Sequence, residues 1–155
     1  MSEPWHKVVR RCAYAAVLGL CYTALHAAPA DPDHEWQEVD VPPPPAFSST
    51  QLLKLDMPPY VSMKLGIDPA TLQITPDGVV RYVVVAISPS GSVNAMYEGL
   101  RCSTAEVRTY ARTSGHLPWT IVKDAPWRAL NDPLPSKHAQ VFAGQGACEG
   151  NGPRL

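Results

Sequence analysis

Charged residues are scarce in this sequence, and their balance excludes several classes of partner. Only 17% of the 155 residues are charged, with 13 basic against 14 acidic side chains. A surface that follows nucleic-acid phosphates needs a basic excess, so nucleic acid is not expected as a partner. The same balance argues against binding to an anionic membrane surface.

Motifs for catalysis and for metal or cofactor binding are also missing. Beyond the first 30 residues, His34, His116 and His138 form no HxH, HxxxH or HExxH spacing. The sequence contains no G-x-S-x-G motif, no P-loop and no dinucleotide fingerprint. We therefore expect no metal site and no cofactor, and we assign no catalytic residues.

The first 27 residues have the layout of a cleaved secretory signal peptide. Lys7, Arg10 and Arg11 form a positive n-region, and residues 12–25 form an uncharged, mostly apolar h-region. This run is shorter than the roughly 20 residues that cross a bilayer, which disfavours an uncleaved anchor. We therefore predict export, with no transmembrane span in the mature chain.

The position of cleavage determines the mature chain. Cleavage after Ala27 fits best, with Ala30 as the alternative. Acylation at Cys21 would instead make the protein a lipoprotein, but Leu20 occupies a position that needs a small residue. Loss of three cations and one carboxylate with the signal leaves 10 basic and 13 acidic residues, a formal charge of −3.

Only two cysteines, Cys102 and Cys148, remain in the predicted mature chain. An even pair in an oxidising compartment predicts a disulfide bond. Closing this loop would stabilise the fold by roughly 3–4 kcal/mol in the chain-entropy model. Two unpaired buried thiols are the alternative if the chain is not exported.

The mature chain divides into three parts. Residues 28–50 are proline-rich, and the run 42–45 must adopt an extended polyproline conformation, which we interpret as a stiff surface spacer. An α+β domain is predicted over residues 51–148, and residues 149–155 are predicted to be a flexible tail. If Trp36 docks on the domain, the domain begins near that residue instead.

The strongest structural signal is a long β-hairpin over residues 77–102. Residues 79–87 are mostly β-branched and predict a strand, and residues 92–102 return as its partner after the turn at 88–91. Shorter strands are expected before it, at 51–56, 60–67 and 71–75.

Side-chain pairing across the hairpin indicates its register. Pairing Ile87 with Ser92 places Arg81 opposite Glu98, and it also places Tyr82 opposite Tyr97. A slip of one residue would place Tyr82 opposite Glu98 and lose both pairs, so we predict the first register. In that register, Arg101 lies on the opposite face from Arg81 and Glu98.

Two short helices are expected after the hairpin. Ser103 and Glu106 form a capping box before a helix that ends near residue 113. Ser136 is predicted to cap a final helix that extends to about Ala143. The predicted fold class is therefore α+β, a small antiparallel sheet built on one long hairpin, with two short helices and one disulfide.

The hairpin also carries a family resemblance. DGVVRY (77–82), the Ser-Gly turn followed by Asn94, and YEGLRC (97–102) precede a tryptophan and a late cysteine. In these segments the chain resembles the CNP-one-like family of small exported bacterial proteins, named after a cryptic neisserial protein. The resemblance covers most of the mature chain and implies a location in the cell envelope, here the periplasm. The family has no established activity, so no catalytic residue is carried over.

Arg81, Glu98 and Arg101 are the charges within the apolar hairpin, and they are candidate binding residues. A carboxylate near guanidinium groups could act as a base or bind an anion. An ion pair between strands that only fixes the register explains the same residues.

Aromatic residues supply the other candidates. Tyr97, Trp119 and Trp127 are suited to contact a ligand or a protein partner, or to complete a small core. Two hypotheses follow. The first is a non-catalytic binding module of the cell envelope, with an unknown envelope protein or small ligand as its partner. The second is a small periplasmic hydrolase that uses Glu98 with Arg81 or Arg101.

Overall fold

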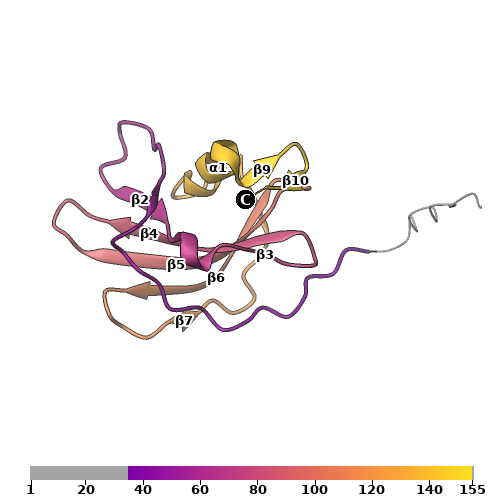
Figure 1. Ribbon diagram of the computed structural model, residues 1–155, viewed down its shortest axis with the longest axis horizontal. Coiled ribbons are helices and arrows are strands. Elements are labelled where there is room, and N and C mark those ends of the chain that lie inside the picture. Colours follow the sequence, from indigo (N-terminus) through magenta and orange to yellow (C-terminus); the bar gives the residue numbers. More distant parts are fainter. Residues whose placement is uncertain (1–34, 155) are drawn as a thin grey trace, which may run out of the picture. The chain divides into compact units, whose positions relative to one another are not determined.

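The computed structural model describes residues 35–154 (Figure 1). The predicted signal peptide, both cleavage sites and Cys21 lie outside this part of the chain. Within it, no helix has both the length and the apolar character needed to cross a membrane.

Three long antiparallel strands form the centre of the fold. They are β4 (Val79–Ile87), β5 (Val93–Arg101) and β6 (Glu106–Ser114), each of nine residues. Shorter strands extend this sheet to the order β1-β2-β4-β5-β6-β7, with β3 paired to β4 and β8 paired to β6. Their bounds are Leu53–Lys54 (β1), Lys64–Ile67 (β2), Gln73–Ile74 (β3), Thr120–Ile121 (β7) and Arg128–Ala129 (β8).

The predicted register of β4 and β5 is wrong by one residue. Tyr82 lies opposite Glu98, and Arg81 lies opposite Gly99. The loop is one residue longer than predicted, because the Ser88 amide donates to the Ser92 carbonyl oxygen at 2.9 Å and Ile87 then pairs with Val93. The expected Arg81–Glu98 and Tyr82–Tyr97 pairs therefore do not form across the strands.

The helix predicted after Cys102 is also wrong, because that segment is strand β6. The Ala105 amide donates to the Cys102 carbonyl oxygen at 3.3 Å, and Ala105 has a positive φ of 53°. This tight turn sends the chain back along β5. Glu106 accepts a hydrogen bond from the Thr104 hydroxyl at 2.6 Å and does not cap a helix.

A β-bulge interrupts the pairing of β5 with β6. Glu98 lies opposite Thr109 and Tyr97 lies opposite Ala111, so Tyr110 is the extra residue on β6. Side chains alternate between the faces of a regular strand, and an extra residue reverses the alternation beyond it. Thr109 and Arg112 consequently reach the same face of the sheet as Glu98.

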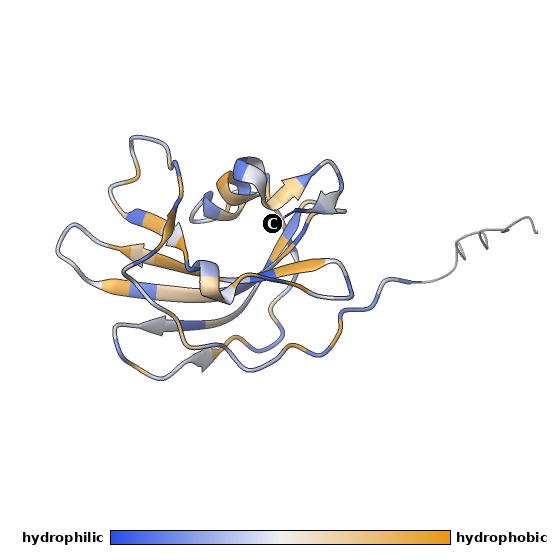
Figure 2. Cartoon of the chain, in the orientation of Figure 1, coloured by the Kyte–Doolittle hydropathy of each residue, from blue (hydrophilic) through white to orange (hydrophobic). Residues whose placement is uncertain are grey.

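Each face of the sheet has its own apolar core. On one face, Tyr82 packs edge-on against Phe142 of helix α1 (His138–Phe142), with ring centroids 4.7 Å apart. On the other, Val83 and Tyr97 pack with Phe47 and other residues under the N-terminal segment. Figure 2 shows that the hydrophobic residues lie mainly on the strands and on α1, whereas the loops are mostly hydrophilic.

The C-terminal region is tied to the sheet by the predicted disulfide between Cys102 and Cys148, whose Cα atoms lie 5.6 Å apart. Helix α1 lies within the segment predicted for the final helix and continues as a π-helical turn (Ala143–Ala147). Beyond it, β9 (Cys148–Glu149) pairs with β10 (Gly152–Pro153) in the segment predicted to be a tail. A short 3-10 helix (Pro69–Thr71) precedes β3. Over residues 35–154 the fold is thus mostly antiparallel sheet, with one α-helix that continues into a π-helical turn and one disulfide.

Candidate functional site

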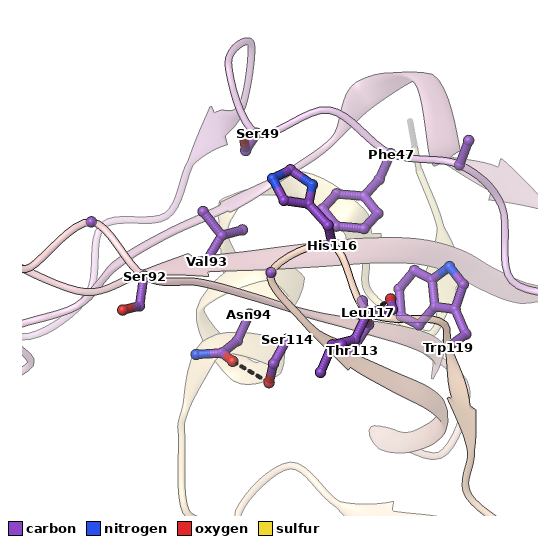
Figure 3. A pocket seen from close by; sticks show the side chains of 13 residues that line it. Phe47, Ser49, Ser92, Val93, Asn94, Thr113, Ser114, His116, Leu117 and Trp119 are labelled. Carbon is purple, nitrogen blue, oxygen red and sulfur yellow. Dashed lines mark hydrogen bonds between the residues drawn. The ribbon is translucent and has the colours of Figure 1, made fainter.

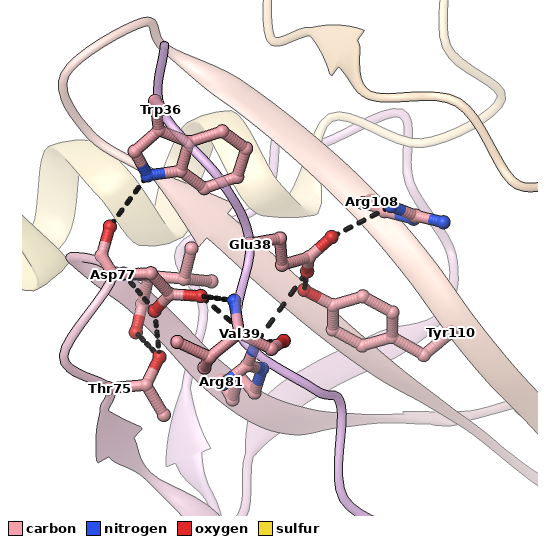
Figure 4. A network of polar contacts seen from close by, with 9 residues as sticks. Trp36, Glu38, Val39, Thr75, Asp77, Arg81, Arg108 and Tyr110 are labelled. Atoms are coloured by element: carbon pink, nitrogen blue, oxygen red, sulfur yellow. Dashed lines mark hydrogen bonds and ion pairs between the residues drawn. The ribbon is translucent and has the colours of Figure 1, made fainter. Parts of the chain in front are cut away.

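Arg81 lies at the centre of a buried polar network on the face covered by the N-terminal segment (Figure 4). Its side chain is 1% exposed, and its Nη2 donates to Asp77 Oδ2 and to the Val39 carbonyl oxygen, both at 3.2 Å. Glu38 lies 3.6 Å away and also pairs with Arg108 at 2.7 Å. Two carboxylates, of Asp77 and Glu38, therefore alternate with the guanidinium groups of Arg81 and Arg108 where the segment packs on the sheet.

This network anchors the segment to the sheet. The Val39 amide donates to Asp77 Oδ2 at 3.0 Å, and the Tyr110 hydroxyl donates to Glu38. Burial opposes ionisation of Asp77, but hydrogen bonds from Thr75, Val39 and Val79, with the charge of Arg81, lower its pKa overall. The ionised carboxylate is thus held in place, and its partners are supplied by the chain itself.

Trp36 connects the same segment to two other candidate residues. Its indole nitrogen donates to the Asp77 carbonyl oxygen at 2.8 Å (Figure 4). Arg101 lies over the Trp36 ring at 3.7 Å, and Trp127 packs against it edge-on with centroids 5.8 Å apart. Arg101 and Trp127 therefore serve as part of the docking surface for the segment.

Glu98 lies on the opposite face of the sheet, in a second polar cluster. Its Oε2 accepts from the Tyr82 hydroxyl at 3.0 Å and lies 2.7 Å from His138 Nε2. Its Oε1 accepts from the Thr109 hydroxyl at 3.1 Å. Only 2% of the Glu98 side chain is exposed, so this carboxylate is enclosed by donors from β4, β6 and α1.

The charge of Glu98 changes the titration of its neighbours. Burial opposes protonation of His138, but the attraction of Glu98 and their hydrogen bond raise the pKa of His138 overall. Burial, followed by the charge of Glu98, raises the pKa of Tyr82 well above its ordinary value. His138 Nδ1 lies 3.0 Å from the Ser136 hydroxyl, so both ring nitrogens have partners.

A cavity of about 520 Å³ opens beside this cluster, and we call it the Glu98 cavity. Glu98, Thr109, Ser136 and His138 line it together with the loop between β7 and β8. The bulge in β6 places Arg112 on its wall as well. β-bulges are frequent next to functional sites, because they redirect a side chain.

Trp119 lines a larger and more open groove of about 760 Å³ (Figure 3). Phe47 and Trp119 form an edge-on pair with centroids 5.5 Å apart, and His116 and Leu117 line the groove near them. The Ser114 hydroxyl donates to Asn94 Oδ1 at 2.7 Å on its floor. The groove carries no Asp, Glu, Lys or Arg among the described residues that line it.

Comparison with known protein families shows which family the chain belongs to. The model of the CNP1-like family matches residues 31–154. The chain belongs to the CNP1-like family. No curated protein and no solved structure matches it.

The structure of this CNP1-like chain divides the predicted site residues among three places. Arg81, Tyr97, Arg101 and Trp127 lie under or beside the N-terminal segment. Trp119 lines the open groove, and Glu98 lines the cavity on the other face. The predicted placement of Arg81 beside Glu98 is therefore wrong. Arg101 lies on the face of Arg81 and not opposite it, although its predicted separation from Glu98 holds.

Sequence reasoning missed the residues that surround Glu98. The sequence pattern predicts Ser136 only as a helix cap, although Ser136-Lys137-His138 also places a histidine two residues beyond a hydroxyl. Thr109 and Arg112 were assigned to a helix, so their position beside β5 was not expected. Within residues 35–154, no group of three or more His, Cys, Asp or Glu residues is arranged to hold a metal ion.

Proposed function

We propose that this CNP1-like chain is a non-catalytic binding module of the cell envelope, exported to the periplasm, and that the Glu98 cavity is its ligand site. One observation carries the proposal: a buried carboxylate whose hydrogen bonds are supplied by the protein forms the wall of a cavity of about 520 Å³. Small-molecule sites typically have volumes of roughly 300–1,000 Å³.

The state of Glu98 supports binding over catalysis. A general acid or base must come within hydrogen-bond reach of the proton that it transfers. Glu98 is 2% exposed and already accepts from Tyr82, Thr109 and His138, so a substrate would have to displace one of these donors. The pair with His138 instead fixes the position of α1 against the sheet and so shapes the cavity.

Two features support export. The sequence begins with the layout of a signal peptide, and the Cys102–Cys148 disulfide fits an oxidising compartment. Fusion of alkaline phosphatase to the C-terminus tests the location, because that enzyme is active only after export. Activity that persists without residues 1–27 would contradict the proposal.

The cavity itself is tested with N-phenyl-1-naphthylamine, a neutral dye whose fluorescence rises in apolar sites. Ala125 lines the cavity, and Ala125→Trp should fill it and abolish the fluorescence increase. Ala46 lines the Trp119 groove, so Ala46→Trp is the matched control and should bind as the wild type does. Equal binding by wild type and Ala125→Trp, with both folded by circular dichroism, would refute the proposed site.

One arrangement favours a second function, a small hydrolase. The Ser136 hydroxyl lies 3.0 Å from His138 Nδ1, and His138 Nε2 lies 2.7 Å from Glu98, which is the order of a serine–histidine–carboxylate triad with the roles of the two ring nitrogens exchanged. Arg81 and Arg101 have no part in it, because they lie on the other face. Hydrolysis of p-nitrophenyl butyrate that is lost in Ser136→Ala would favour this function, whereas equal background rates favour binding.

A further inference from the structure

We infer that the ligand of the Glu98 cavity is an amphiphilic oxyanion, a carboxylate or phosphate group on an apolar body, whose charged end is held by Arg112 and Lys123. This inference rests on the proposed function and names the class of molecule that the cavity takes. Three properties of the cavity support it.

The first property is the charge of the lining. Arg112, Lys123 and Arg128 line the cavity, against Asp124 and Glu98. Glu98 is matched by His138, whose pKa it raises, and Arg128 is matched by Asp132 at 3.1 Å. Arg112, Lys123 and Asp124 remain, a net charge of +1, and within residues 35–154 neither of these two cations has a carboxylate within 4.0 Å.

This local positive charge contrasts with the whole chain, whose formal charge is −1. Arg112 reaches the cavity only because the bulge reverses the alternation of β6. Lys123 comes from the loop after β7. Two cations from separate elements at one opening favour an anionic group between them.

The second property is the apolar wall. Side chains of strands β5 and β6 and of the loops before α1 supply hydrocarbon surface: Met96, Val107, Val122, Pro126, Leu134 and Pro135. Apolar surface that faces a cavity of this size gains free energy when a ligand removes it from water. An inorganic anion would leave this surface wet, so the ligand needs an apolar part.

The third property is the hydrogen bonding of the polar groups around Glu98, which form one wall of the cavity. The Tyr82 and Thr109 hydroxyls donate to Glu98, and both His138 nitrogens have partners. Because these groups are already satisfied, an apolar body can lie against them without leaving a buried donor unpaired. The charged end of the ligand then lies at the opening, next to the exposed Arg112 and Lys123.

Four eight-carbon probes separate charge from hydrophobicity: octanoate, octyl phosphate, octanol and octylammonium. Each is titrated against the purified protein with bound N-phenyl-1-naphthylamine, and dye displacement gives its affinity. We expect octanoate or octyl phosphate to bind about tenfold more tightly than octanol. Comparison of the two anions distinguishes a carboxylate ligand from a phosphate ligand.

The double variant Arg112→Gln/Lys123→Gln tests the two cations directly. It should reduce the preference for the anions over octanol to less than about twofold, with octanol affinity unchanged. Lys54→Gln/Lys64→Gln removes the same charge from β1 and β2 and should preserve the preference. All four side chains are exposed, so neither double variant should unfold the protein.

The outcomes distinguish this inference from the function on which it rests. If octanol or octylammonium bound as tightly as the anions, the ligand would not be an oxyanion. The cavity would then remain a binding site for another class of ligand. Loss of the preference in Lys54→Gln/Lys64→Gln would overturn the assignment to Arg112 and Lys123. Failure of the dye and of all four probes to bind would refute both the ligand class and the proposed site.

Discussion

Replacement of Gly99 by alanine tests how closely the strands and the N-terminal segment are packed. A Cβ atom at this position would overlap the hydroxyl oxygen of Tyr110, and it would lie 2.8 Å from Cζ of the same ring and 2.9 Å from Val79 Cγ1. Contacts below 3.0 Å force a shift of the neighbours. The Tyr110 ring must therefore move, and this disrupts the hydrogen bond that its hydroxyl donates to Glu38.

The expected cost combines three effects. Overpacking in a well-packed core costs about 1–3 kcal/mol. Loss of a hydrogen bond to a charged group costs roughly 1.5–3 kcal/mol. The smaller backbone entropy of alanine in the unfolded chain offsets about 0.5–1 kcal/mol. Gly99→Ala should thus lower the free energy of unfolding by about 3 kcal/mol.

Urea denaturation at pH 7, followed by tryptophan fluorescence, measures this change. Gly144→Ala is the matched control, because no atom lies within 4 Å of its added Cβ and its φ is not positive. In a Tyr110→Phe background, which removes both the nearest atom and the hydrogen bond to Glu38, Gly99→Ala should cost about 2 kcal/mol less. A stability within about 0.5 kcal/mol of the wild type, or an equal cost in both backgrounds, would refute the packing argument.

Three further predictions concern the links between the sheet and the rest of the chain. Replacing Cys102 and Cys148 by serine opens a loop of sequence separation 46 and should destabilise the protein by about 4 kcal/mol in urea denaturation; an unchanged midpoint would contradict the chain-entropy estimate. Because Glu98 raises the pKa of His138, the stabilisation by the charged histidine is fully present below the unfolded pKa of 6.5 and is lost as the pH rises through the folded pKa. The stability difference between wild type and His138→Gln should therefore shrink as the pH rises above 6.5, and a difference that grows would reverse the assigned sign. Trp36→Ala removes an indole hydrogen bond, a cation–π contact and an aromatic pair, and should cost about 2 kcal/mol and speed proteolysis within residues 35–50; equal cleavage rates would show that the segment does not depend on this anchor.

The sequence was informative where the pattern was local and strong. The β-branched run 79–87 forms a strand, the disulfide between Cys102 and Cys148 is present, and α1 lies within the predicted final helix. The family resemblance, based on the DGVVRY and YEGLRC segments, is also confirmed. Each of these inferences depended on neighbouring residues or on a pair of cysteines.

The errors have a common physical cause. Val107, Tyr110 and Ala111 have helical spacing, but the bulge places Tyr110 and Ala111 together in one core while Val107 packs in the other. The register was predicted from an Arg81–Glu98 charge pair and a Tyr82–Tyr97 aromatic pair. Arg81 instead pairs with Asp77 and with the distant Glu38, and Glu98 pairs with the distant His138, and the sequence around the hairpin does not indicate these two distant partners.

Distant partners also explain why the Glu98 site was missed. Glu98 meets His138 across 40 residues of sequence, and the intervening turns decide that contact. Arg112 reaches the cavity only through a one-residue shift in pairing. Contacts of this kind depend on tertiary structure, which spacing alone does not encode.

The six residues of the YEGLRC segment have a consequence for the order of folding. Within this one stretch, Glu98 contacts α1, Arg101 contacts Trp36 and Cys102 bonds to Cys148. The segment thus contacts residues from both ends of the range 35–154. Its native contacts cannot all form until both of these regions have been synthesised. Long-range contacts of this kind slow folding, typically to milliseconds or seconds. We expect the native state to be reached only after the last residues have emerged, with bond formation by Cys148 among the final steps.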